Sequence, residues 1–215
     1  MDRMSAAPRF RAAEFEKLKN SLVIYRCALK IIETKLSNLS DCYSAFYEGN
    51  PIEHIEYRIK TAESIAGKLK ARKLPLTAQA AVDNLTDIAG ARVICSYAKN
   101  IAEIADIIRA QDDITVVSEK DYISKPKPSG YRSYHIVAEV RPGVLFGEQT
   151  CRAEIQIRTS AMDFWASLEH KARYKYGGGE IPEHLSRELR VCADKIHELD
   201  KRMYLIHELV ELVNE

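Results

Sequence analysis

The sequence lacks an excess of charge of either sign and has no long hydrophobic run. It carries 32 lysine and arginine residues against 31 aspartate and glutamate residues, so net charge gives no reason to expect nucleic acid or a membrane surface as partner. Every apolar run is far shorter than the roughly 20 residues of a membrane span. Residues 1–8 also lack the apolar stretch of a secretory signal. We therefore expect a protein without membrane segments, located in the cytoplasm.

The sequence also lacks paired cysteine motifs. Its five cysteines are odd in number and scattered, and no two are spaced as CxxC. This disfavours both a disulfide framework and a zinc site. Internal repeats are missing, and three consecutive glycines at 177–179 are the one low-complexity segment. The length of 215 residues and a hydrophobic content of 46% fit one substantial globular domain with helical extensions.

Residues 151–159, CRAEIQIRT, alternate strictly between two kinds of side chain. Period two predicts a half-buried strand, with Cys151, Ala153, Ile155 and Ile157 on the apolar face and Arg152, Glu154, Gln156 and Arg158 on the polar one. Apolar residues at helical spacing follow at once, and Thr159 is a suitable N-cap. The plain interpretation is a solvated strand face. The alternative is a site for a metal and a phosphate, because polar side chains here run into a helix N-terminus.

Two long segments predict amphipathic helices. Between residues 15 and 39, and again between 185 and 213, apolar residues recur at alternating spacings of three and four. The second helix begins near Pro182, and the three glycines end the helix that starts after Thr159. A seam of this kind packs either on its own domain or against another copy of the chain, and the spacing fits both.

A further helix is predicted after Pro51, over residues 52–72. Its apolar stripe leaves a ridge of polar side chains at successive i+4 positions: Lys60, Ser64, Lys68 and Arg72. A cationic ridge is usually a solvated face. A hydroxyl among cations is also what a polyphosphate would require.

The middle of the chain predicts alternating helices and strands. We expect helices over 78–82 and 101–110, and strands over 91–95, 114–117 and 131–140. Asp87 stands just before the first of these strands, and a loop rich in proline and lysine covers 121–130. The fold class is therefore α+β, a mixed central sheet flanked by helices, with long amphipathic helices at both ends. The sequence leaves parallel and antiparallel pairing open.

Three segments resemble the signature blocks of the RelA/SpoT-type alarmone synthetases. They are DIAGAR at 87–92, GYRSYH at 130–135 and EIQIRT at 154–159, and AMDFW at 161–165 and LEH at 168–170 extend the match. The resemblance covers about 50–180. It implies a single synthetase domain over 1–215, with a nucleotidyltransferase-like catalytic core at 50–180 and terminal helices at 11–40 and 182–213. No segment is a candidate for the HD-type hydrolase domain of the long members.

The resemblance implies a reaction and its partners. Pyrophosphate moves from ATP to the 3′-hydroxyl of GTP or GDP, and AMP is released, with Mg²⁺ as cofactor; the product is the alarmone (p)ppGpp of the stringent response. Small members of the family imply a homotetramer, and an allosteric nucleotide or single-stranded RNA as further partners. Two alternatives stay open: a toxin-type relative that modifies tRNA or adenosine nucleotides, and a member that binds nucleotide or RNA without turnover.

The same resemblance assigns roles to single residues. Asp87 and Glu154 match the metal-binding and catalytic carboxylates, and Glu154 is either a base or only a metal ligand. The ATP-binding positions are Arg58, Lys60, Ser64 and Arg92, to which the cationic ridge adds Lys68 and Arg72. The acceptor nucleotide is assigned to Tyr131, Lys120, His135, Gln156 and Asp163. Tyr131 is the stacking aromatic.

Two positions depart from the family's pattern. Asp163 stands where close relatives carry asparagine. Ser118 stands at the first position of a four-residue motif that is tied to the choice of acceptor in the long relatives. No preference between GTP and GDP is therefore implied.

Overall fold

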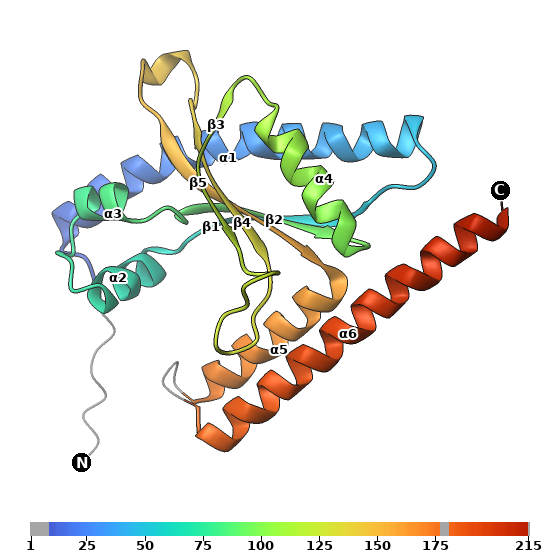
Figure 1. The fold of residues 1–215 in the computed structure, drawn as a ribbon. Helices are drawn as coiled ribbons and strands as arrows, with labels where there is room; N and C mark the ends of the chain where they lie inside the picture. Colours follow the sequence, from blue (N-terminus) through green and yellow to red (C-terminus); the bar gives the residue numbers. More distant parts are fainter. Residues whose placement is uncertain (1–8, 177–180, 215) are drawn as a thin grey trace.

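A computed structural model describes residues 9–176 and 181–214 (Figure 1). Its centre is a five-stranded sheet in the order β1-β2-β5-β4-β3. The strands are β1 (Ile52–Ile59), β2 (Ala89–Cys95), β3 (Ile114–Asp121), β4 (Tyr134–Val140) and β5 (Cys151–Thr159). The helices are α1 (Ala12–Phe46), α2 (Ala62–Ala71), α3 (Ala78–Asn84), α4 (Ala98–Arg109), α5 (Ser160–Lys175) and α6 (Glu183–Asn214), with a 3₁₀ turn η1 (Val144–Phe146).

The sheet is mixed, which confirms the predicted fold class. β2 and β5 are parallel neighbours at its centre, whereas the pairs β1–β2, β4–β5 and β3–β4 are antiparallel. The parallel register sets Gly90 opposite Glu154. Asp87, just before β2, is thereby brought to the same part of the sheet as the polar face of β5.

The two faces of the sheet differ sharply. Ala153, Ile155 and Ile157 of β5 are fully buried on the apolar face. Helices α1 and α4 cover that face, and their buried side chains form one core with it. The face that carries Glu154 and Gln156 is polar, and α5 and α6 cover only its end. The polar face is therefore left for a site.

The helix predicted over residues 52–72 is wrong. Residues 52–59 form strand β1, and only residues 62–71 form helix α2, whose N-cap Thr61 accepts a hydrogen bond from the amide of Ser64. The isoleucines at 52, 55 and 59 fit a helical stripe, but Ile55, Tyr57 and Ile59 also alternate with polar residues. Pairing with β2 along the whole segment decides for the strand. Lys60 therefore precedes the helix and lies outside the predicted ridge.

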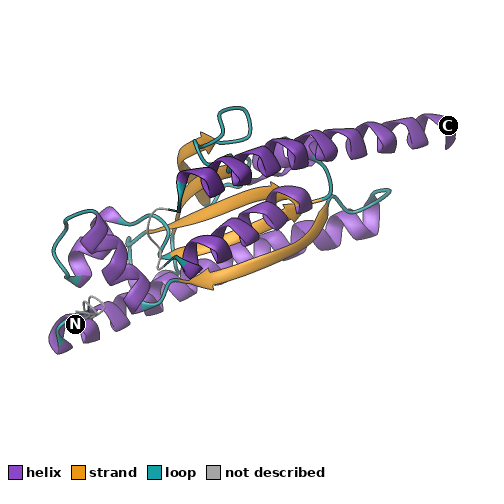
Figure 2. Ribbon diagram, turned by 90° about the horizontal axis from the view of Figure 1, so that it is seen from below, coloured by secondary structure: helices purple, strands orange, loops and turns teal. Residues whose placement is uncertain are grey.

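Helix α1 belongs to the core of its own chain. Leu18, Leu29, Ile32 and Leu36, which carry its predicted seam, are buried against the sheet and α4. Of the two interpretations of this seam, packing within the domain is the one that the structure shows. The helix runs along the whole sheet, as Figures 1 and 2 show.

Helix α6 behaves differently. Its first half lies along α5, its second half contacts the start of α4 through His207, and its C-terminal end extends beyond the rest of the chain (Figure 2). Most of the predicted seam is exposed there: Leu199, Met203, Ile206, Val210 and Val213 are at least half exposed. None of the described helices is long and apolar enough to cross a membrane. The glycines at 177–179, predicted to end the preceding helix, lie outside the described residues.

Candidate active site

A cleft of about 560 Å³ opens on the polar face of the sheet. Strands β1, β2 and β5 form its floor, because alternate residues of each point to this side. Its lining residues are Glu56, Tyr57, Arg58, Asp87, Gly90, Ala91, Arg92, Glu154 and Gln156. Five of the predicted site residues, among them both carboxylates, thus meet in one place.

Asp87 is held by two lysines. Its Oδ2 accepts hydrogen bonds from Lys60 Nζ at 2.8 Å and Lys68 Nζ at 2.6 Å. Burial alone would raise the pKa of Asp87, but these hydrogen bonds and charges outweigh it and hold the pKa below its ordinary value. The other oxygen, Oδ1, is buried and has no hydrogen-bond partner among the described residues. Asp87 is therefore ionised with one oxygen free, as a ligand for a cation would be.

Glu154 is equally well held. Its Oε1 lies 3.1 Å from His135 Nδ1, and its Oε2 accepts a 2.7 Å hydrogen bond from Gln156 Nε2. Burial would raise the pKa of Glu154, and so does the charge of Asp87, but His135 and Gln156 lower it below the ordinary value. The carboxylate is therefore ionised at neutral pH and fixed in orientation within the cleft.

A hydrogen-bonded chain connects Glu154 to the loop before β4. His135 Nε2 lies 2.8 Å from the hydroxyl of Tyr131, and Arg158 donates both to that hydroxyl and to Gln156 Oε1. Arg158 also pairs with Asp163 at 3.0 Å. Although it lies on the polar side of β5, the Arg158 side chain is only 5% exposed. A buried guanidinium with three partners fixes the whole group rigidly.

Two cations lie close to the ring of Tyr131. Lys127 Nζ is 4.5 Å from its centroid, and Arg158 Cζ is 5.0 Å from it. The ring is half-buried, and Lys127 Nζ also lies over the ring of Tyr122, 4.6 Å from its centroid. Both faces of the ring attract positive or polarised groups, which suits a stacking surface.

Three further residues predicted to bind ATP do not lie together. Arg92 pairs with Glu56 at 2.8 Å and with Asp163 at 3.3 Å, so it joins the cleft to α5. Ser64 lies exposed in the first turn of α2, and Arg72 donates to the carbonyl oxygen of Asn84. The predicted continuous ridge thus does not form.

Two residues of this region were not among the predicted site residues. Arg158 was placed on the polar face of its strand, for which both a solvated face and a metal and phosphate site were open, and Lys127 was placed in a loop. The GYRSYH block gave Tyr131 and His135 but not the cations around them. Lys120, which was predicted, lies opposite His135 in the register of β3 and β4 and is exposed.

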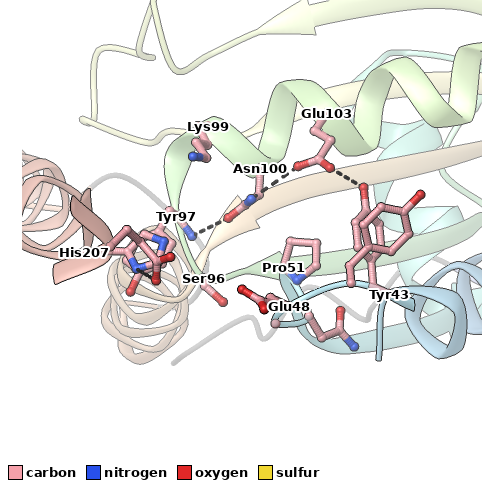
Figure 3. A pocket seen from close by; sticks show the side chains of 13 residues that line it. Tyr43, Glu48, Pro51, Ser96, Tyr97, Lys99, Asn100, Glu103 and His207 are labelled. Atoms are coloured by element: carbon pink, nitrogen blue, oxygen red, sulfur yellow. Dashed lines mark hydrogen bonds and ion pairs between the residues drawn. The ribbon is translucent and has the colours of Figure 1, made fainter. Parts of the chain in front are cut away.

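A second hollow, of about 380 Å³, lies between α1, α4 and α6 (Figure 3). Tyr97 stacks on His207 at 4.5 Å within it, and Tyr43 donates to Glu103. None of the predicted site residues lines it. Its acids and bases are already partly paired, so it serves to join α6 to α4.

Comparison with known proteins agrees with this geometry. Residues 57–179 match the model described as the region found in RelA/SpoT proteins. The chain is 41% identical to the GTP pyrophosphokinase YwaC of Bacillus subtilis, over 91% of this chain and 93% of that protein.

Solved structures give the same relation. The small alarmone synthetase 1 of Bacillus subtilis bound to its product pppGpp superposes with a TM-score of 0.84 at 36% identity, over 91% of this chain and 98% of that one. The same synthetase bound to AMPCPP gives a TM-score of 0.75 at 33% identity, over 90% and 98%.

Proposed function

The chain belongs to the family of RelA/SpoT proteins, and we propose that it is a GTP pyrophosphokinase that makes (p)ppGpp. It transfers the β,γ-pyrophosphoryl group of ATP to the 3′-hydroxyl of GTP or GDP. The oxygen of that hydroxyl bonds to the β-phosphorus, the bond from this phosphorus to the oxygen of the α-phosphate breaks, and AMP leaves with that oxygen. The proton of the hydroxyl is lost in the same step.

The observation that carries this proposal is the pair of ionised carboxylates in one cleft. Asp87 and Glu154 line it together, one flanked by two lysines and the other by a histidine and an amide. Pyrophosphoryl transfer requires little covalent chemistry from the protein, but it does require in-line positioning and neutralised charge. A cleft with fixed carboxylates and adjacent cations provides both.

The residues present fit a Mg²⁺ ion. Asp87 Oδ1 is a buried carboxylate oxygen without a partner among the described residues, and Glu154 lines the same cleft. Proteins commonly hold Mg²⁺ by one or two carboxylates together with phosphate oxygens. We assign Asp87 as a ligand, with Glu154 as the second. Bound there, the ion would neutralise charge on the phosphates of ATP.

Glu154 has two candidate roles, general base and metal ligand, and only the base accepts a proton. As a base it takes the proton of the 3′-hydroxyl, and His135, 3.1 Å from it, holds the carboxylate in place. As a ligand it takes none. Either task requires the ionised form, which the lowered pKa of Glu154 provides.

The two nucleotides are assigned to opposite ends of the cleft. The end near β1 and α2, with Arg58, Lys60 and Lys68, is cationic and suits the triphosphate of ATP, and Ser64, Arg72 and Arg92 complete the assignment. The end near β4, with Tyr131, His135 and Gln156, offers an aromatic ring and polar groups for the guanine nucleotide, together with Lys120 and Asp163. We place the enzyme in the cytoplasm, because its substrates are there and all five cysteines are free.

Incubation of the purified protein with Mg²⁺, ATP and a guanine nucleotide is expected to release AMP and a 3′-pyrophosphorylated guanosine nucleotide in equal amounts. The transfer couples the two products, so AMP release should depend on the guanine nucleotide. Nucleotide chromatography measures both products.

Parallel reactions with ATP alone and with tRNA as acceptor are the controls. AMP release that is independent of GTP and GDP would contradict the proposal, and a product on ATP or on tRNA would assign the toxin-type activity instead. Binding of GTP without any AMP would indicate a non-catalytic member.

We also propose that the chain forms a homo-oligomer, a tetramer as in the resemblance, through the second half of α6. Leu199, Ile206 and Leu209 are each more than half exposed there, and a continuous apolar face of this kind normally meets a partner. Helix α1 contributes less than its seam predicted, because the seam is buried in its own chain.

The variants Leu199→Asp and Ile206→Asp are expected to lower the oligomer mass to that of smaller species, since each places a charge in an apolar contact. Light scattering at micromolar concentration measures the mass. Leu145→Asp, on the equally apolar but isolated turn η1, is the matched control and should leave the mass unchanged. Wild-type protein of monomer mass would refute the proposal.

A further inference from the structure

The loop before β4 is attached to helix α6 along one stripe of that helix. Arg190 donates to the carbonyl of Pro128 at 3.4 Å, Ala193 meets Gly130, and Asp194 pairs with Arg132 at 3.1 Å. Positions 190, 193 and 194 are spaced as one face of a helix. The stripe therefore fits the residues on both sides of Tyr131, the residue assigned to the acceptor nucleotide.

The contact at Gly130 is unusually close. Gly130 is buried with φ +92°, a conformation that favours glycine, and a Cβ built on it would lie 2.5 Å from the Cβ of Ala193. The backbone of the loop thus rests directly on the helix. Neither residue can grow without moving the loop away from α6.

Arg132 connects the loop in two directions. Its Nη1 donates to the carbonyl of Ile123 at the start of the loop, at 3.1 Å, while its Nη2 donates to Asp194. The arginine side chain is 13% exposed and Asp194 is 59% exposed. A mostly buried arginine therefore joins the start of the loop, its end and α6.

The same helix is attached to the strand that carries Glu154. Thr159, the last residue of β5, donates a 2.7 Å hydrogen bond to Asp200, and both side chains are buried. Trp165 Nε1 of α5 donates to the carbonyl of Leu189. Helix α6 therefore contacts both the strand β5, which carries Glu154, and the loop before β4. We call this loop, residues 122–133, the acceptor loop.

From these contacts we infer that α6, through Ala193 and Asp194, positions the acceptor loop and so sets the affinity for the guanine nucleotide without touching it. Asp194 and Arg132 are positioning residues in this scheme. It rests on the proposed function, because the loop matters for the acceptor only if Tyr131 binds that nucleotide. Among the described residues, none of Arg190, Ala193 and Asp194 lines the cleft that contains the ATP end.

Two variants perturb the contact between the acceptor loop and α6 in different ways. Asp194→Asn removes the ion pair from an exposed position and should raise the KM for the guanine nucleotide about two- to fivefold, the range of such pairs. Ala193→Val adds bulk where Gly130 touches the helix and should raise it at least about fivefold. In both variants the KM for ATP and kcat should stay within about twofold of wild type.

Each variant has a matched control on the same helix. Glu198→Gln removes an exposed charge that pairs, within the described residues, only with Arg202, and Cys192→Val places the same β-branched side chain at an exposed neighbouring position. Both controls should leave all kinetic constants unchanged. Circular dichroism and the oligomer mass show that every variant is folded and assembled.

Hydrogen exchange of residues 122–133 provides a readout that does not depend on activity. It should accelerate in Asp194→Asn and Ala193→Val and stay as in wild type in the two controls. Unchanged exchange in both variants would show that Ala193 and Asp194 do not hold the acceptor loop in place. Faster exchange with an unchanged KM for the guanine nucleotide, or an equal rise in the KM for ATP, would overturn its link to the acceptor. Failure of the proposed function shows separately, as wild-type protein that releases no AMP.

Discussion

Replacing Glu154 by glutamine is expected to lower kcat by at least about 100-fold, the lower end of general-base contributions. The change keeps the shape of the side chain and its hydrogen bond from Gln156, but it removes the negative charge. Whether Glu154 takes the proton or holds Mg²⁺, both tasks need that charge. Rapid-mixing or steady-state kinetics with saturating substrates measure kcat.

The Mg²⁺ dependence of the variant separates the two tasks. If Glu154 is a metal ligand, the variant should need a higher Mg²⁺ concentration for its half-maximal rate. If Glu154 is a base, that concentration should stay nearly unchanged. Glu139→Gln is the control, because Glu139 is a carboxylate on neighbouring β4 whose one ion pair in the part of the chain that the structure describes is with Arg152. Near-normal turnover in Glu154→Gln would show that the mechanism proposed for the cleft is wrong.

Replacing Tyr131 by alanine is expected to raise the KM for the guanine nucleotide about 10- to 100-fold, because base stacking on an aromatic ring is worth roughly 1–3 kcal/mol. The KM for ATP should change little, since Lys60 and Lys68 lie at the other end of the cleft. A kinetic matrix over both substrates measures the two constants independently.

Tyr131→Phe separates the ring from its hydroxyl. The hydroxyl joins His135 to Arg158 and lies two hydrogen bonds from Glu154, so alanine removes both a stacking surface and a link in this chain. Phenylalanine keeps the ring and should hold the KM within about threefold of wild type. If phenylalanine is as harmful as alanine, the network and not the ring binds the acceptor; if ATP is the nucleotide affected, the two ends of the cleft are reversed.

Much of the fold was predictable from periodicity. The alternation in residues 151–159 gave β5 and its polar face, and Thr159 caps α5 as expected. The helix predicted over residues 52–72 was wrong because the isoleucines there fit both a helix and a strand. Only pairing with β2 distinguishes the two. Pairing between strands distant in sequence leaves no mark on local spacing.

The site was predictable to a smaller extent. The motifs of the family resemblance singled out Asp87 and Glu154, but their meeting depends on the parallel register of β2 and β5, which the sequence left open. Alternation placed Arg158 on the polar face of its strand but gave it no specific role, because its burial comes from contacts with Tyr131 and Asp163 in other parts of the chain. The ion pair between Arg132 and Asp194 joins a loop to a helix, so no periodic pattern in the sequence predicts it.

The attachment of the acceptor loop to α6 has a consequence for biosynthesis. Ribosomes extend chains at about 5–20 residues per second, and domains begin to fold from the N-terminal side. The sheet strands and both carboxylates are synthesised before Ala193, Asp194 and Asp200. A nascent chain that stalls between β5 and the middle of α6 would thus carry the catalytic strand with an acceptor loop that lacks its contacts with α6. Full affinity for the guanine nucleotide should therefore be reached only once α6 has left the ribosome.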